Sequence, residues 1–477
     1  NAMTDPRSVV RAVLVYALCI PAAIMLGYML AMPLDFASLV SIGLVLTLLL
    51  APVFLRWHYP LLLLSWNTIA VLPFLPGRPQ IRLLLTGISL LITWLMYTLD
   101  RRSRPQNVGA ITWPLLAMSA AIFVTMQVTG GAGFLKLGGT VGGAGRYVLL
   151  AGAILGYFAI SARPIPVEKA NLYVALFFLG GLTQMLSSLA AFVPDWLKFV
   201  FYVFPMEESF FEQSPTVVGF GVSRIYGGAT ASMCALLYLL ARFGLRGIFD
   251  TTKAWRAVAF IVCCIGVLIG GYRSFMLLVL GIVGVQAYLE GFFRMKYLPV
   301  WLVIAGLGLS LWPMANRLPY RIQRSLAFLP WLPVSNEVYL DTQGSTEWRT
   351  EIWARVWREW RNEPSLWLLG KGYRLDVRDL ENAFFRGGHS GALTEVASDY
   401  HSGPLTVIVP LGLVGAVVLI WFWIASWRLL LRNYHQSPPE LKMINTLLLA
   451  MFCVRVFHFL IIFGNFYSDL ANFTGLV

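Results

Sequence analysis

The sequence predicts an all-α polytopic membrane protein with about 12–13 transmembrane helices and one large outer loop that contains amphipathic helices. First, 58% of the 477 residues are hydrophobic and only 12% are charged, whereas roughly 25% of the residues of soluble domains are charged. Second, the mean hydropathy is +0.71. Third, long apolar segments recur from end to end. One soluble core cannot bury this much apolar surface, so lipid must be the solvent.

Each predicted helix is an apolar segment of about the length that crosses a bilayer core, which is roughly 20 residues. Backbone groups in lipid must be hydrogen-bonded within their own segment, so these segments are expected to be helical. The candidate spans are 9–32, 36–55, 59–76, 81–99, 109–128, 146–162, 170–190, 226–243, 257–272, 274–289, 298–315, 403–424 and 442–463.

The basic residues predict which way the helices run across the membrane. Lys and Arg gather in alternate connections, for example at Arg101 and Arg102 and again at Arg242 and Arg246. Short connections rich in Lys and Arg face the cytoplasm. We therefore expect the N-terminus in the cytoplasm, together with every second connection.

This orientation leaves the longest connection on the outer face. We divide the chain into a transmembrane bundle with rim arginines over residues 1–315, a large outer loop over 316–402 and C-terminal transmembrane helices over 403–477. Binding and catalytic residues concentrate on loops that a rigid scaffold positions. The outer loop is therefore the first place to look for a site.

The outer loop contains the segment STEWRTEIWARVWREWRNEP, residues 345–364. Trp348, Ile352, Val356 and Trp360 recur at helical spacing, and arginines occupy many of the other positions. A helix of this composition suits the membrane interface. A helix packed against the transmembrane bundle accounts for the pattern equally well.

Two arginines mark the outer rim of the bundle. Arg224 in GFGVSRIYGGATAS stands at the mouth of a predicted helix, and Arg273 in GVLIGGYRSFMLLVLG stands at the tip of a hairpin. Arg273 could simply snorkel, but glycines beside both arginines permit close approach of a bulky polar ligand. Two guanidiniums could clamp a diphosphate, because arginine matches phosphate oxygens bidentately. Arg317, Arg321 and Arg324 could add to this field or form a solvated basic segment.

Two ionisable residues fall inside the last predicted span. Arg455 and His458 lie about one helical turn apart in CVRVFHFLIIFG. Ionisable groups within a membrane are functional candidates by default. For these two we favour a structural pair that faces the interior of the bundle.

Two His-Ser-Gly triplets lie close together in the outer loop, at His389 and His401. His401 leads directly into an apolar segment. It is followed by Ser402, nine residues, Gly412, two residues and Gly415, a spacing that His389 lacks. The two triplets are therefore unequal, and His401 is the stronger candidate for chemistry.

The pattern that begins at His401 resembles the signature of bacterial O-antigen ligases. Three other segments resemble that family as well: RIYGGATAS after Arg224, GYRSFMLLVLG around Arg273, and the loop segment that ends in Gly370 and Gly372. The resemblance covers about residues 215–425. Tyr272 replaces the Ser that usually precedes the second arginine, and Gly403 and Pro404 replace bulkier residues. These departures bear on the acceptor more than on the reaction.

The resemblance to the O-antigen ligase and polymerase superfamily implies a GT-C-like glycosyltransferase of the bacterial inner membrane whose active site faces the periplasm. It implies transfer of a glycan from undecaprenyl diphosphate to a sugar hydroxyl of lipid A–core. In the related O-antigen and exopolysaccharide polymerases, the acceptor is a second lipid-linked glycan. The reaction is expected to invert the anomeric centre without a metal ion or other cofactor. Membrane lipid is a further expected partner, and nucleic acid is not.

The same resemblance assigns roles to residues. His401 is the expected general base, because a sugar hydroxyl is a weak nucleophile and a histidine can take its proton near neutral pH. Arg224 and Arg273 would bind the donor diphosphate. The accessory candidates are Arg321, His389, Glu395 and Asp399. Glu395 and Asp399 could orient the ring of His401, hold an acceptor sugar, or be solvated loop acids, and His389 could line the acceptor site.

A transporter of lipid-linked glycans is the alternative from another functional class. Such proteins typically show internal repeats and ionisable residues near the bilayer midplane. This sequence has no clear repeat, and its notable arginines lie at one rim. Both observations favour the transferase.

Overall fold

The protein is an all-α polytopic membrane protein in which two short strands are the only described residues paired as strands. The computed structural model describes residues 36–73, 75, 77–99, 108–133, 141–206, 224–310, 312–376 and 398–477, with a few single residues between 16 and 27. The chain divides into two units, Asn1–Tyr59 and Pro60–Val477. The site described below lies entirely in the second unit.

The described helices follow the apolar pattern of the sequence. They are α2 (Phe36–Ser65), α3 (Ile81–Leu99), α4 (Gly109–Thr129), α5 (Ala144–Ser161), α6 (Ala170–Leu179), α7 (Gln184–Ser188), α8 (Tyr226–Ile248), α9 (Trp255–Ile269), α10 (Arg273–Leu289), α11 (Leu298–Ser310), α12 (Tyr320–Leu326), α13 (Asn336–Asn362), α16 (Gly403–His435), α17 (Lys442–Phe457) and α18 (Phe466–Thr474). The strands β1 (Val141–Gly142) and β2 (Leu375–Asp376) pair antiparallel.

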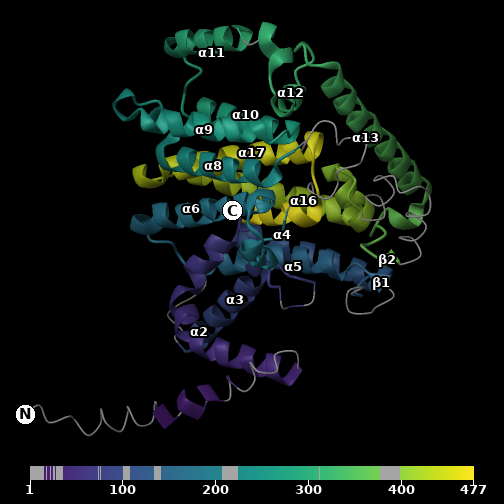
Figure 1. The fold of residues 1–477 in the computed structure, drawn as a ribbon. Coiled ribbons are helices and arrows are strands. Elements are labelled where there is room, and N and C mark those ends of the chain that lie inside the picture. The colour runs from purple at the N-terminus through teal and green to yellow at the C-terminus, as the bar shows by residue number, and fades with distance from the viewer. Residues whose placement is uncertain are drawn as a thin grey trace, which may run out of the picture. The chain divides into compact units, whose positions relative to one another are not determined.

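Seven segments of the described residues are long and apolar enough to cross a membrane. They are α3, α4, α5, the segment Val167–Ser188 with α6 and α7, α8, α16, and the segment Pro439–Ile462 with α17. The helices α9 and α10 are apolar but shorter. Figure 1 shows α8, α9, α10, α16 and α17 side by side in one bundle.

The predicted spans agree with most of these helices, and one prediction is wrong. The spans predicted at 81–99, 109–128 and 146–162 correspond to α3, α4 and α5. The predicted span 59–76 does not form a helix of its own, because α2 continues to Ser65 and the chain then turns. Three prolines and a glycine fall within residues 73–79, and proline cannot donate to a helical ladder. The predicted span 9–32 lies mostly outside the described residues.

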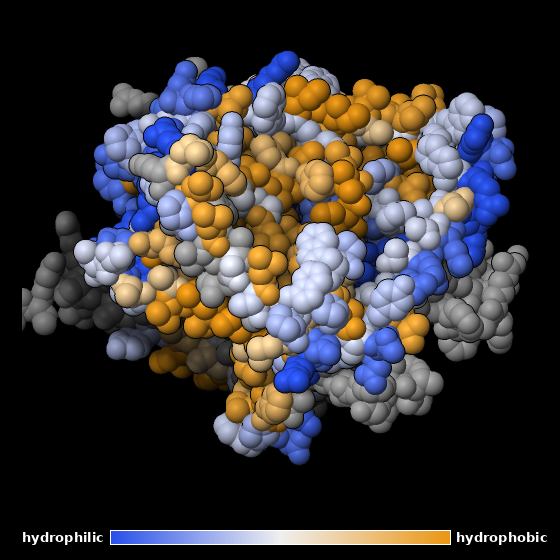
Figure 2. All heavy atoms as spheres, turned by 90° about the horizontal axis from the view of Figure 1, so that it is seen from above, coloured by the Kyte–Doolittle hydropathy of each residue, from blue (hydrophilic) through white to orange (hydrophobic). Residues whose placement is uncertain are grey.

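Apolar side chains cover the middle of the face seen in Figure 2, and hydrophilic residues gather towards its two ends. Exposed apolar residues also line α9, where Val258, Ile261 and Val262 are each more than half exposed. A belt of exposed apolar side chains between two polar ends is the surface that a bilayer covers.

The most deeply buried span, α8, is broken at Gly244, whose φ is +62°. The break frees backbone N–H groups, and those of Leu245 and Arg246 donate to the carboxylate of Glu290 at 2.9 and 3.1 Å. Gln286 Nε2 donates to the same carboxylate at 2.8 Å. Glu290 therefore caps the helical segment that follows the break, and this role explains a buried acid within the bundle.

The helix α16 is broken at Gly412, where φ is +64° and ψ is −165°. The segment 367–372, which we call the strap, fills the break. The N–H groups of residues 413–414 donate to strap carbonyls at 2.8 and 3.2 Å, and the carbonyls of residues 409–410 accept from strap N–H groups at 2.9 and 3.0 Å. The strap thus satisfies the backbone groups that the break leaves without helical partners.

The long helix α13 precedes the strap in the chain and packs against the first turns of α16. Its buried residues Ile352, Val356 and Trp360 form one apolar cluster with Leu405 and Val409. Figure 1 shows α13 crossing one end of the bundle instead of running parallel to its helices. The sequence allowed either a helix at the membrane interface or a helix packed against the bundle, and the structure shows packing against the bundle.

We expect Gly412→Ala to lower the melting temperature markedly. A Cβ at this position would lie 2.2 Å from the carbonyl oxygen of Leu368, and a side chain in such a backbone conformation costs about 1–3 kcal/mol before that clash is counted. The matched control is Gly344→Ala in α13, where a Cβ meets no atom within 4 Å. Thermal unfolding in detergent measures both, and equal melting temperatures would contradict the role of the strap.

Candidate active site

His401 lies in the short coil that leads into α16, and its backbone is strained. The φ angles of Ser398 and His401 are both +52°, a conformation that costs a residue with a side chain about 1–3 kcal/mol. The neighbouring carbonyl of Tyr400 accepts a hydrogen bond from Trp353 Nε1 at 2.7 Å. Contacts from α13 therefore hold this coil in place, and such strain is typical of functional sites.

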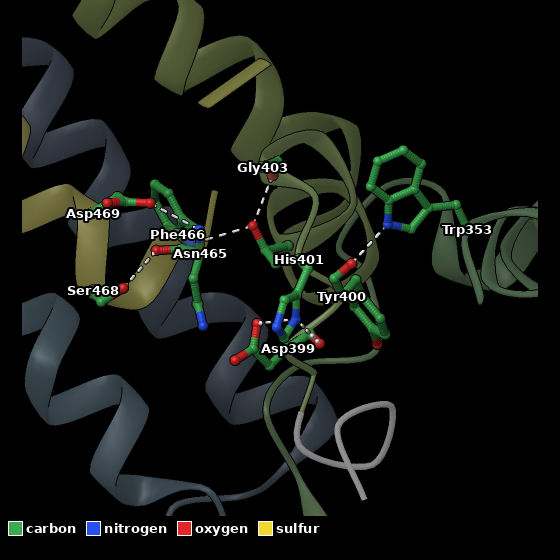
Figure 3. A network of polar contacts seen from close by, with 10 residues as sticks. Trp353, Asp399, Tyr400, His401, Gly403, Asn465, Phe466, Ser468 and Asp469 are labelled. Atoms are coloured by element: carbon green, nitrogen blue, oxygen red, sulfur yellow. Dashed lines mark hydrogen bonds and ion pairs between the residues drawn. The ribbon is translucent and has the colours of Figure 1, made fainter. Parts of the chain in front are cut away.

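The start of α16 packs tightly against the residues that follow α17 and lead into α18. A Cβ on Gly403 would lie 2.1 Å from the carbonyl oxygen of Phe459. Thr406 Oγ1 donates to the Gly403 carbonyl at 2.7 Å and accepts from the N–H of Phe466 at 3.1 Å (Figure 3). Packing therefore requires a glycine at position 403. This is one of the positions at which the sequence departs from the O-antigen ligase signature.

Asp399 and two aromatic rings position the imidazole of His401. Its Nδ1 lies 3.3 Å from both the carbonyl oxygen and the carboxylate Oδ1 of Asp399 (Figure 3). Both atoms are acceptors, so they favour the tautomer with hydrogen on Nδ1 and a lone pair on Nε2. The rings of Trp348 and Phe463 pack perpendicular to the imidazole at 5.4 and 5.1 Å.

The same contact keeps Asp399 ionised. Burial by itself would raise the pKa of Asp399, but hydrogen bonding and charge attraction to His401 outweigh burial and hold the pKa of this carboxyl below its usual range. The carboxylate can therefore stabilise a positive charge on the imidazole of His401.

His401 lines a cavity of about 500 Å³ within the bundle. Arg224, which directly precedes α8, and Arg349 of α13 line the same cavity. Arg224 also lies over the ring of Tyr272, with its guanidinium carbon 5.4 Å from the ring centre. The cavity thus combines a histidine with guanidiniums from two other parts of the chain.

A smaller cavity of about 190 Å³ is lined by four arginines, Arg224, Arg273, Arg324 and Arg349. We call these residues the arginine cluster. Arg224 and Arg349 line both cavities, so the cluster borders the space beside His401. Arg324 Nε pairs with Asp341 at 2.5 Å, and Arg273 Nη2 donates to the carbonyl of Thr342 at 3.5 Å. Contacts with the outer-loop helix α13 therefore help to orient the cluster.

The charged groups that act on Arg349 are all arginines, so no negative charge balances it. Its Nε is buried and has no hydrogen-bond partner within the described parts of the chain. Burial lowers the pKa of Arg349, and the like charges of Arg273, Arg224 and Arg324 lower it further. A bound anion would replace this repulsion by charge-assisted hydrogen bonds. The cluster is therefore suited to bind a polyanion.

The structure brings Arg224, Arg273 and His401 to the two adjoining cavities. Arg321 lies in α12 but lines neither cavity, whereas Arg324, one turn further on, lines the smaller one. Arg349 escapes prediction because it resembles one of the polar positions of an amphipathic helix. A signal for it existed, since it lies three residues before Ile352 and thus on the buried face of α13.

The other accessory candidates have different outcomes. Asp399 contacts His401 directly, whereas His389 and Glu395 lie outside the described residues. Across the residues that the structure describes, no group of three or more His, Cys, Asp or Glu side chains is arranged to hold a metal ion.

Comparison with known proteins adds no relative: no protein-family model and no curated protein matches the chain.

We expect inorganic pyrophosphate to raise the melting temperature of the purified protein, because a polyanion relieves the repulsion within the arginine cluster. Arg349→Gln should reduce that rise. It should also raise the melting temperature of the ligand-free protein by about 1–2 °C, since one like charge is removed. Arg358→Gln, on the exposed face of the same helix, should change neither value. An undiminished pyrophosphate effect in Arg349→Gln would show that the cluster does not bind this anion.

Proposed function

We propose that the protein is a membrane glycosyltransferase that moves a glycan from undecaprenyl diphosphate to a sugar hydroxyl, as an O-antigen ligase does with lipid A–core. The observation that carries this proposal is the convergence of His401 and the arginine cluster on adjoining cavities of a membrane-spanning bundle. A general base beside a polyanion site is what the reaction requires. The sequence motifs around Arg224, Arg273 and His401 support the same conclusion.

The arginine cluster would bind the diphosphate of the donor. The leaving group gains negative charge as its bond to the sugar breaks, and guanidiniums fixed in advance stabilise that charge without reorganisation. Arginine suits this task because its planar fork binds phosphate oxygens bidentately and stays charged. The unmatched charge of Arg349 supports this assignment, since a dianionic ligand would supply the missing partner.

His401 would activate the acceptor. Its Nδ1 faces Asp399, so Nε2 takes the proton from the acceptor hydroxyl. The hydroxyl oxygen forms a bond to the anomeric carbon while the bond from that carbon to the diphosphate oxygen breaks, and undecaprenyl diphosphate leaves. A single displacement inverts the anomeric centre. Asp399 stabilises the imidazolium that forms, as the acid of a catalytic triad does.

We place this site on the periplasmic side of the bacterial inner membrane, with the N-terminus in the cytoplasm. The helix α8 begins beside the site at Tyr226 and is 23 residues long, enough to cross the membrane. The far end of α8 carries Arg246, and Lys253 in the connection and Arg256 at the start of α9 follow it. Connections of this kind face the cytoplasm.

His401→Gln should lower the rate of glycan transfer by about 10²–10⁴-fold, the usual contribution of a general base. The assay uses proteoliposomes with an undecaprenyl-diphosphate glycan and, separately, lipid A–core or a second lipid-linked glycan as acceptor. His435→Gln, at the far end of α16, is the control and should be fully active.

The products also decide between related functions. A glycan on lipid A–core supports a ligase, and a longer lipid-linked glycan supports a polymerase. Full activity of His401→Gln would exclude it as the base. Movement of the donor across the membrane without any new glycosidic bond would indicate a transporter instead.

We expect Asp399→Asn to lower kcat by at least about tenfold and to leave KM nearly unchanged, because the carboxylate stabilises an imidazolium that forms only during the reaction. Asp195→Asn removes an acid from an exposed pair with Lys198 and serves as the control. An equal loss in both variants, or a loss confined to KM, would contradict the positioning role of Asp399.

A further inference from the structure

The larger cavity has a second basic group besides the arginine cluster. Arg82 of α3 and Arg455 of α17 also line it. The groups that act electrostatically on Arg349 are the other members of the arginine cluster, whereas those that act on Arg455 are Asp469 first, then Cys234 and Tyr226. The cavity lining therefore contains a second pair of arginines on helices other than those of the arginine cluster, and this second basic region is not needed to bind the diphosphate.

Arg455 is a cation without a matched partner inside a membrane-spanning segment. Its Nε is buried and has no hydrogen-bond partner among the residues that the structure describes. The nearby carboxylate of Asp469 instead accepts hydrogen bonds from the N–H of Asn465 at 2.8 Å and from Asn472 Nδ2 at 3.2 Å. Charges in this environment are costly unless a partner compensates them. The Nε–H of Arg455 is therefore available to a ligand in the cavity.

Arg82 is held firmly but only by neutral groups. Its guanidinium lies 5.4 Å from the ring centre of Trp66, and its Nη2 donates to Gln80 Oε1 at 2.7 Å. Arg82 and Arg455 thus supply two positive charges, against which Asp469 supplies one negative charge. The balance favours one further anionic group.

Amide side chains complete the lining of this region. Asn67 Nδ2 donates to the carbonyl of Phe177 at 2.7 Å, and Gln184 Nε2 donates to the carbonyl of Asn67 at 3.4 Å. Asn472 likewise donates to Asp469. Each of these amides donates one of its two N–H groups to the protein, and its side-chain carbonyl oxygen is suited to accept a hydrogen bond from a ligand. Acceptors of this kind match the hydroxyl groups of a sugar.

We propose that this region of the cavity binds an anionic sugar of the substrate glycan, one that bears a carboxylate or a phosphate. Arg82 and Arg455 bind the anionic group, and the amides of Asn67, Gln184 and Asn472 accept hydrogen bonds from its hydroxyls. The inference rests on the proposed glycan transfer and narrows its substrate to acidic glycans. It differs from the diphosphate site, which the arginine cluster forms.

The test measures binding of soluble trisaccharides to the full-length protein in lipid nanodiscs. One probe ends in glucuronate, the second in glucose 6-phosphate and the third in glucose. Charge-assisted hydrogen bonds should make at least one anionic probe bind about tenfold or more tighter than the neutral probe, and whichever anionic probe binds tighter identifies the group. Arg455→Gln and Arg82→Gln should each abolish the preference. Arg432→Gln, an exposed arginine at the far end of α16, should retain it.

Inorganic pyrophosphate separates this inference from the proposed function. Arg455→Gln should still bind pyrophosphate, which also shows that the variant is folded, and Arg349→Gln should keep the preference for an anionic sugar. Equal binding of all three trisaccharides by the wild type, or an intact preference in both Arg82→Gln and Arg455→Gln, overturns the inference. Failure of the wild type to bind pyrophosphate instead counts against the donor site, whatever the sugar preference.

Discussion

The site depends on the insertion of the strap into the broken helix α16. At Gly412 the helix loses its own backbone hydrogen bonds, and residues 367–372 replace them from a segment that follows α13. These hydrogen bonds attach the segment after α13 to the middle of α16. Closer to His401, the apolar cluster around Ile352 and Leu405 packs the two helices against each other. Helix α13 is thereby aligned so that Trp348 and Arg349 lie beside the histidine. Without the break, α16 would have no free backbone groups to bind the strap.

The same region concentrates features that lower stability. His401 and Ser398 have left-handed backbone angles, and Arg349 and Arg455 have buried Nε atoms without partners in the described structure. Each feature is unfavourable by itself, and tight packing around Gly403 and the strap keeps the arrangement in place. Outside the cavity, the buried acid Glu290 is compensated within the protein, because its carboxylate caps the broken α8. In the cavity, by contrast, a bound anion would supply the partner that the Nε atoms of Arg349 and Arg455 lack.

The sequence predicts the parts of this structure that depend on local chemistry. Apolar length alone locates α3, α4 and α5, and the junction between loop and helix singles out His401. Apolar length fails at 59–76, because α2 extends to Ser65 and the prolines from Pro73 onward prevent a second helix from reaching residue 76. The spacing between His401 and Gly412 is visible in the sequence. The structural role of Gly412 is not, because it depends on pairing with the strap, about forty residues earlier in the chain. Arg349 joins the cluster because α13 packs against the bundle. The periodicity of the sequence predicts which face of α13 is buried, but not which part of the protein that face contacts.

The division of one cavity into two basic regions has a consequence for how a transferase of this kind would work. A donor held only by its diphosphate could rotate about the P–O bonds next to the anomeric oxygen, so the anomeric carbon would seldom face the base. A second anchor further along the glycan removes that freedom, and fixing reacting groups in this way can account for much of a rate enhancement. The described cavity has walls from α3, α8, α13 and α17 as well as from His401, so both anchors and the base belong to one folded unit. On this argument, recognition of the glycan by Arg82 and Arg455 would contribute to catalysis as well as to specificity, because binding energy gained away from the reacting carbon is used to orient it.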